Sequence, residues 1–290
     1  MATQNALDHL ILFLPADPAT NLPKIPDFIT KNFTLTPGGT HADGLTSNTL
    51  ILLADGCYIE LISFVPSAPP SGISSHWWSP FAASPGWADW CLTNALSPAA
   101  NYASLTSTHQ PPIHGGRKRA DGVDVKWAVT FPAGENGGQA SRGKIPFFCH
   151  DTTPRSVRVP LTPEKTTHPS GVLGVAALDV LVKDLAAFKE AQLVYDKLFG
   201  EPIEREGIAE WQATRVVPMP RLQEEVGGPW IQIRVARSEE EKERVRERGF
   251  WFGRVVLAAK APERNDIGKK VRLDGGGDDL RGLWIEYVDV

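Results

Sequence analysis

The chain has 290 residues, enough for one large core or two smaller ones, and 42% of them are apolar while 22% are charged. Its formal net charge of −4 gives no electrostatic basis for binding nucleic acid or an anionic membrane surface. No apolar run reaches the roughly 20 residues of a membrane-spanning helix, and the N-terminal residues lack the basic start of a signal peptide. Three widely spaced cysteines without a C-x-x-C pair are typical of free thiols in a reducing compartment. We therefore expect a cytoplasmic protein whose partner is a small-molecule substrate.

The first 65 residues predict strands and one short helix in the order β-α-β-β-β. Uninterrupted apolar runs predict the buried strands, and apolar residues at helical spacing predict the helix. Glycine-rich turn sequences separate these segments. The elements expected are strands at residues 7–14, around 41, 48–53 and 58–64, with a helix at 25–33.

The next segment repeats this order at a similar length. Its strands are expected at residues 87–92, 116–131 in two parts, and 145–151, with a weaker helix candidate at 99–107. A repeated supersecondary unit is the strongest architectural indication in the chain. The sequence therefore predicts an α+β domain over residues 1–160, built from two βαβββ modules at about 5–65 and 86–151.

An extended linker at residues 152–170 leads to a C-terminal α+β unit at 171–290, with a third, diverged module as one interpretation. Its best helix pattern covers residues 186–199 and ends at Gly200. Ser238 and Glu241 form a capping-box pattern at the start of a charged helix. The sequence leaves three roles open for this unit: it could complete a second cup, cover the first cup, or form a homodimer contact.

Three of the expected strands each carry a titratable residue among apolar ones, namely His9, Glu60 and His150. Such a side chain is costly inside a buried strand unless it is paired or binds a metal ion. The residues alone leave alternatives open. His9 could be a core histidine, Glu60 could pair with an arginine, and His150 or its neighbour Asp151 could face inward, because strand neighbours point to opposite faces.

Several motifs resemble the glyoxalase-like domain of the vicinal oxygen chelate superfamily. Its first module is matched by Leu7-Asp8-His9, Gly38-Gly39-x-His41-x-x-Gly44-x-x-x-Asn48 and Tyr58-Ile59-Glu60-Leu61. Its second is matched by Gly116-Arg117-x-Arg119-x-Asp121-Gly122, Trp127 and Pro146-Phe147-Phe148. The stretch Phe147-Phe148-Cys149-His150-Asp151 with Thr153-Pro154-Arg155 resembles a fungal branch. The resemblance covers roughly residues 5–160 and implies βαβββ modules whose curled sheets form an open cup.

The resemblance further implies a divalent metal ion in the cup, held by the first and last strands of each module. It assigns His9, Glu60 and His150 as ligands, while Trp90 or Asp89 stands where the second module would offer another. Two imidazoles and one carboxylate with open positions suit Fe²⁺, Zn²⁺, Mn²⁺ or Ni²⁺.

Other residues are candidates for contact with the substrate. His41 could be a general base, a further ligand or a surface residue, and it is the catalytic candidate together with Glu60. The candidates for binding the substrate are Asn48, Trp90, Arg117, Arg119 and Arg155. The arginines could bind a carboxylate or enolate through two parallel hydrogen bonds, or form structural ion pairs. The tryptophans at 77, 78, 87 and 90 could line an apolar pocket or belong to the core.

The leading functional hypothesis is a metal-dependent isomerase, lyase or hydrolase that stabilises an enolate-like oxyanion of a small oxygen-bearing molecule. A second hypothesis is an iron(II)-dependent dioxygenase of a phenolic substrate, which the identity of the metal would separate from the first. A third is a metal-free protein that binds a small molecule in the cup.

Overall fold

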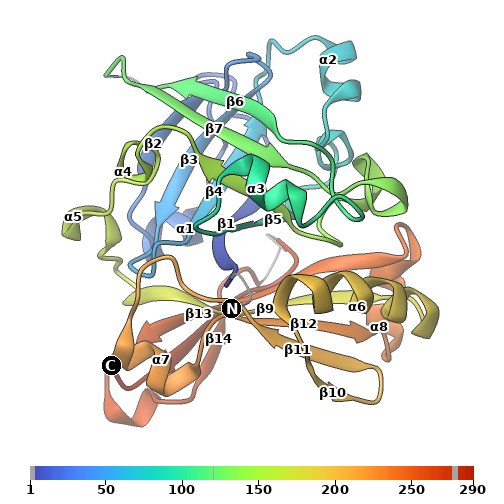
Figure 1. Cartoon of the computed structure of the whole chain (residues 1–290). Coiled ribbons are helices and arrows are strands. Elements are labelled where there is room, and N and C mark those ends of the chain that lie inside the picture. Colours follow the sequence, from blue (N-terminus) through green and yellow to red (C-terminus); the bar gives the residue numbers. More distant parts are fainter. Residues whose placement is uncertain (1–3, 120, 276–279) are drawn as a thin grey trace.

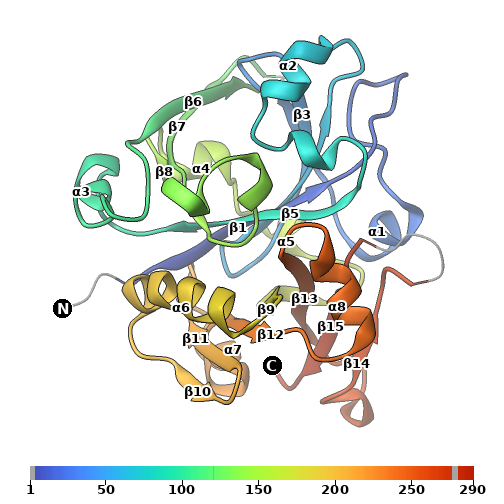
Figure 2. The same cartoon turned by 90° about the vertical axis from the view of Figure 1, so that its right-hand side faces the viewer.

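The computed structural model describes residues 4–119, 121–275 and 280–290. These residues form two mixed sheets, one from each half of the chain, which lie one above the other (Figure 1, Figure 2). The longest described helix has 15 residues, and none is both long and apolar enough to cross a membrane. The sheet of the N-terminal half carries the pocket described below.

The first sheet has eight strands in the order β2-β3-β4-β1-β5-β8-β7-β6. Its first half contains β1 (Ala6–Phe13), α1 (Asp27–Asn32), β2 (Thr36–Thr40), β3 (Thr46–Leu52) and β4 (Tyr58–Phe64). Its second half contains β5 (Gly86–Thr93), α3 (Pro98–Ala103), β6 (Ile113–Lys118), β7 (Asp124–Thr130) and β8 (Phe147–Asp151). Short helices α2 (Pro70–Ser75), α4 (Arg155–Arg158) and α5 (Pro163–Thr166) lie in the connections. Both halves follow the order β-α-β-β-β, so the predicted α+β fold of repeated modules is confirmed.

The eight-stranded sheet curls until its two edge strands meet. A β-bridge joins His41, just after β2, to Arg117 on β6, and the Ala42 N–H donates to the carbonyl of Gly116 at 3.0 Å. Strands β6 and β7 therefore arch over β1 and β5, as the two views in Figures 1 and 2 show. This curl produces a cup whose inner surface faces away from the second sheet.

The second sheet has seven strands in the order β10-β11-β12-β9-β13-β15-β14. One complete module consists of β9 (Val172–Val182), α6 (Leu185–Phe199), β10 (Ile203–Arg205), β11 (Ile208–Gln212) and β12 (Trp230–Val235). A shorter unit consists of β13 (Phe250–Lys260), β14 (Lys270–Arg272) and β15 (Leu283–Val288), while α7 (Pro220–Val226) and α8 (Glu239–Arg246) lie in the connections. The C-terminal unit therefore contains one complete βαβββ module and a shorter second unit. Its local signals are confirmed, because α6 ends at Gly200 and the capping box of Ser238 and Glu241 is formed.

Strand β1 is apolar except for Asp8 and His9, and all eight of its residues are buried. Leu7, Leu10 and Leu12 pack in the core between the two sheets, whereas Ile11 and Phe13 face the inside of the cup. The pairing of β1 with β5 shifts register between Leu7 and His9. A bulge of this kind changes which way a side chain points. Here it places His9 on the cup side of the strand.

Candidate active site

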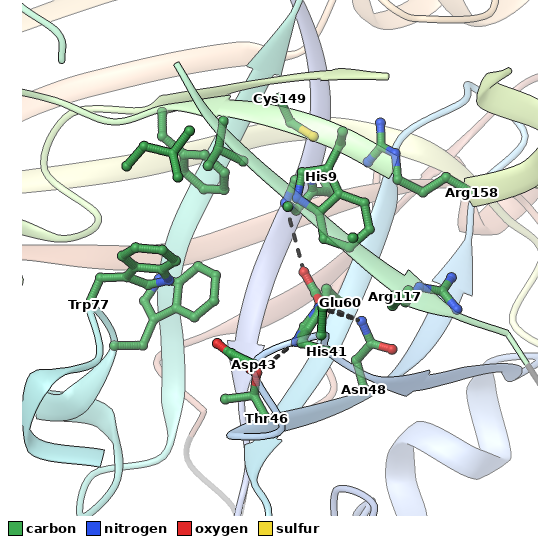
Figure 3. Close-up of a pocket in the computed structure, with 18 of the residues that line it drawn as sticks. His9, His41, Asp43, Thr46, Asn48, Glu60, Trp77, Arg117, Cys149 and Arg158 are labelled. Carbon is green, nitrogen blue, oxygen red and sulfur yellow. Dashed lines mark hydrogen bonds and ion pairs between the residues drawn. The ribbon is translucent and has the colours of Figure 1, made fainter. Parts of the chain in front are cut away.

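The cup contains a cavity of about 250 Å³. The polar side chains on its wall come mainly from the first module (Figure 3). The apolar part of the wall is mainly aromatic, and its aromatic residues are Tyr58, Trp77, Trp78, Trp127, Phe131 and Phe147. A largely apolar pocket with a few convergent polar groups is the usual form of a site for a small molecule.

His9 is buried in this wall, and its ring is fixed on two sides. Its Nδ1 lies 2.5 Å from Oδ1 of Asp8, and its ring stacks on Tyr58 with the centroids 4.7 Å apart. The other nitrogen, Nε2, faces Glu60 and lies 3.8 Å from its Oε2. Histidines that bind metal ions commonly have one ring nitrogen held by a carboxylate in this way.

Asp8 is the centre of a buried ion-pair network behind His9. Arg158 donates from Nη1 to Oδ1 at 2.9 Å and from Nη2 to Oδ2 at 3.0 Å, and Arg155 also donates to Oδ2. Burial by itself would raise the pKa of Asp8, but the two arginines and His9 hold it well below its usual range. Asp151 accepts further hydrogen bonds from both arginines. Arg155, expected to bind substrate, is therefore engaged within the protein and does not line the cavity.

Glu60 is buried and lies between two polar neighbours. Its Oε1 accepts a hydrogen bond from Nδ2 of Asn48 at 2.5 Å and lies 3.4 Å from Nε2 of His41. Burial raises the pKa of Glu60, but His41, His9 and Asn48 together lower it to about 2. Glu60 is therefore ionised at neutral pH.

Asn48 lines the cavity, and its amide is used to position Glu60. Its Oδ1 accepts from the N–H of Gly39 at 3.1 Å, while its Nδ2 donates to Glu60. Gly38 makes room for this arrangement, because a Cβ atom there would lie only 1.9 Å from Oδ1 of Asn48. Asn48 thus positions Glu60, and its expected contact with substrate stays a prediction.

His41 stands where the two edges of the curled sheet meet. Its Nδ1 lies 2.6 Å from Oγ1 of Thr46, so that Nε2 points towards Glu60. Its side chain is 15% exposed and can be reached from the cavity. The structure thus brings His41 to the pair formed by His9 and Glu60.

His150 lies away from this group. Cys149 lines the cavity, and because neighbours on a strand point to opposite faces, His150 points out of the cup. Its Nε2 lies 3.2 Å from Oδ1 of Asn94, and its ring stacks on Phe148. The structure therefore does not bring this expected metal ligand to His9 and Glu60.

A family model of the glyoxalase-like domain matches residues 7–198, about two thirds of the chain. The chain belongs to the glyoxalase-like domain family. This confirms the resemblance drawn from the motifs. A search of curated proteins finds no match to this sequence.

A solved structure shares the fold of this glyoxalase-like protein, and two others are less similar to it. A hypothetical protein from Staphylococcus aureus has 14% sequence identity and a TM-score of 0.62, with 98% of this chain and 99% of that chain covered. Two others are BphC, a halotolerant catechol dioxygenase (10% identity, TM-score 0.44, 100% and 89% covered), and an extradiol ring-cleaving dioxygenase from B. fuscum (8% identity, TM-score 0.42, 100% and 74% covered). The first likeness spans both sheets, so another protein has the same overall arrangement.

The second glyoxalase-like module has no counterpart of Glu60. On β1 and β4, Ile11 lies opposite Glu60, and on β5 and β8, Cys91 lies opposite Phe147. Ile11 and Cys91 both face the inside of the cup. Phe147 therefore takes in the second module the place that Glu60 has in the first, and the polar site is confined to one module.

Trp90 does not reach the cavity, contrary to expectation. It packs in the core between the sheets against Tyr195, Phe199 and Phe252. The neighbouring Asp89 accepts a hydrogen bond from Nε1 of Trp78 at 3.2 Å. The four tryptophans considered as one cluster thus lie in two places. Residues 77 and 78 line the cavity, and residues 87 and 90 lie in the core.

The two arginines expected on β6 and in the turn after it also lie in different places. Arg117 lines the cavity and donates from Nη1 to the carbonyl of Gly38 at 2.8 Å. Arg119 lies outside this cavity and pairs with Asp121 at 2.6 Å. Sequence reasoning missed His76, which also lines the cavity and has its pKa lowered to about 4 by burial. No pattern around it indicates a site.

The family implies a divalent metal ion, and in the cup Glu60 lies near enough to each of two histidines to share an ion with it. Two atoms bound to one ion at about 2.1 Å each can lie at most about 4.2 Å apart. The separations from Glu60 to Nε2 of His9 and to Nε2 of His41, 3.8 and 3.4 Å, are within that limit. Because Asp8 and Thr46 hold the Nδ1 atoms, both Nε2 atoms are available.

A competing group of donor atoms is more closely spaced but less suited to a cation. Among the described residues, the three donor atoms that lie within 4.8 Å of one another belong to Asp8, His9 and Cys91. Both oxygens of Asp8 already accept hydrogen bonds from Arg158, which disfavours a cation there. The donor atoms of His9, His41 and Glu60 do not all lie within 4.8 Å of one another, so these side chains would have to move closer together for all three to bind one ion.

Proposed function

We propose that this protein is a metal-dependent enzyme of the vicinal oxygen chelate type that acts on a small, largely apolar molecule bearing oxygen atoms. The observation that carries the proposal is the convergence of His9 and His41 on the two oxygens of ionised Glu60 within an aromatic pocket. Of the roles left open for His41, its anchored Nδ1 favours that of a ligand.

His9, His41 and Glu60 would hold the ion in this proposal. The ion, when bound, supplies a Lewis acid that stabilises negative charge on an oxygen of the substrate. Asp8 fixes the ring of His9, and Asn48 fixes the carboxylate of Glu60, so the donors are held in place before substrate arrives.

The remaining wall binds and orients the substrate. The aromatic side chains of the wall exclude water from an apolar ring or branched chain. Nδ1 of His76 accepts from the N–H of Trp78 at 3.3 Å, which places the proton of the neutral ring on Nε2. His76 can therefore donate a hydrogen bond to a substrate oxygen.

Isomerisation, elimination and hydrolysis through an enolate-like oxyanion all suit this arrangement, and they form the leading reaction class. A second candidate is an iron(II)-dependent dioxygenase of a phenolic substrate, because two imidazoles and one carboxylate are the ligand set of non-haem iron oxygenases. The likeness to a fungal branch of the family stays a prediction and does not distinguish the two.

The test is the metal content of protein purified without chelator, measured by elemental analysis. Wild type should carry about one ion per chain, and His9→Ala, His41→Ala and Glu60→Gln should lose it while their circular dichroism is unchanged. His150→Ala is the matched control and should keep the ion. Iron would favour the dioxygenase, and zinc, nickel or manganese the Lewis-acid enzyme. Wild type that stays free of metal after incubation with these ions would overturn the proposal and favour a metal-free binding protein.

A further inference from the structure

A second cavity, of about 200 Å³, adjoins the aromatic pocket. Leu50, Arg117 and Arg158 line both cavities, so the two spaces share a wall. Arg119 and Lys165 also line the second cavity, which makes its surroundings strongly basic. Figure 3 shows Arg117 and Arg158 on the side of the aromatic pocket opposite Trp77.

Most of the positive charge around this second cavity is already neutralised within the protein. Arg158 is paired with Asp8 and Asp151, and Arg119 is paired with Asp121. These guanidinium groups shape the cavity, but their charges are balanced. They do not by themselves call for an anionic ligand.

Arg117 differs from its neighbours. It is only 6% exposed, and it donates from Nη1 to the uncharged carbonyl of Gly38 at 2.8 Å. No carboxylate of the described residues forms a direct ion pair with it, and burial lowers its pKa. The more distant charge of Glu60, which is already in contact with Asn48 and His41, partly opposes this lowering. A buried charge without a counter-charge is costly, and a ligand that brings one negative charge removes that cost. Lys165, half-buried at the same cavity, adds a second positive charge.

We propose that the second cavity is a subsite for the carboxylate of an elongated substrate whose apolar part occupies the aromatic pocket. A carboxylate fits because Arg117 has no direct ion-pair partner among the described residues and its planar guanidinium matches two carboxylate oxygens. That this ligand is a substrate rests on the proposed function. Binding of its carboxylate to Arg117 does not require a metal ion.

The test compares two probes of equal shape, 3-phenylpropionate and its neutral amide, 3-phenylpropanamide. Protein kept metal-free with chelator is titrated with each probe by calorimetry, and tryptophan fluorescence gives a second reading because Trp77, Trp78 and Trp127 line the pocket. Wild type should bind the carboxylate at least about tenfold more tightly than the amide. In Arg117→Gln this ratio should fall to about one while the affinity for the amide is unchanged.

Lys118→Gln is the matched control, because Lys118 is the exposed neighbour of Arg117 on β6 and lines neither cavity. It should keep the full carboxylate preference. Lys165→Gln should lower the preference about threefold, and it tests the subsite even if Arg117→Gln fails to fold. An unchanged preference in a folded Arg117→Gln or in Lys165→Gln, or no preference in wild type, would overturn the subsite. Because chelator is present, these results are independent of the metal content that tests the proposed function.

Discussion

Asp55 offers a quantitative test of how the two sheets are joined. It lies in the turn between β3 and β4, is 1% exposed, and accepts hydrogen bonds from the N–H of Val175 on β9 at 2.9 Å and of Cys57 at 3.0 Å. Burial raises its pKa from 3.8 to about 6, although these hydrogen bonds and Arg215 oppose the rise. The folded protein therefore holds a proton that the unfolded chain has lost between these pH values.

The sign and size of the effect follow from this shift. A raised pKa of an acid gives stability that is fully present below about pH 4 and is lost as the pH rises through about 6. A shift from 3.8 to about 6 corresponds to about 3 kcal/mol, at about 1.4 kcal/mol for each pH unit. Asp55→Asn cannot ionise, so between pH 4 and 7 its stability relative to wild type should improve by about 3 kcal/mol.

Urea unfolding followed by tryptophan fluorescence, in steps of half a pH unit, measures this difference. Asp124→Asn is the control, because that carboxylate is exposed and should leave the pH dependence of wild type in place. If Asp55→Asn and wild type gave parallel curves of unfolding free energy against pH, the account of a protonated carboxyl at the junction of the sheets would be refuted.

Three further predictions concern the core, acid stability and the site. Trp90→Ala should lower the free energy of unfolding by about 3–5 kcal/mol, measured in urea, while the folded protein binds 3-phenylpropanamide normally. Burial lowers the pKa of His109 to about 4. The stability that the neutral ring contributes is therefore complete above about pH 6.5 and is lost as the pH falls towards 4. In His109→Gln the free energy of unfolding should fall by up to about 3 kcal/mol less than in wild type over this range, in the same assay. Gly38→Ala places a methyl group against Asn48, which should displace its amide from Glu60 and weaken Zn²⁺ binding at least about tenfold by calorimetry.

The repeated modules could be predicted because their signals are local. Apolar runs determine buried strands, and the residues that cap α6 and α8 lie next to those helices in the sequence. His9 and Glu60 could be found because a titratable residue stands out in an apolar strand. The sequence predicts that they share one site with His150, and they lie 3.8 Å apart while His150 lies elsewhere.

The features of the site that could not be predicted depend on contacts between segments far apart in the sequence. A shift of one residue turns a strand's side chains to the opposite face, so sequence alone could not tell that Cys149 faces the cup and His150 faces away. The bridge that brings His41 to the site forms between edge strands far apart in the chain. Trp90 lies in the core because the second sheet covers that side of β5, and nothing near it in the sequence indicates this.

Anomalous diffraction from crystals soaked in Co²⁺ would test the central claim most directly. The account predicts one strong peak in the aromatic pocket, within bonding distance of Nε2 of His9, Nε2 of His41 and the carboxylate of Glu60. The same soak of Glu60→Gln crystals should show no peak at that place. A wild-type pocket without a peak, or a peak at Asp8 and Cys91 instead, would contradict the account.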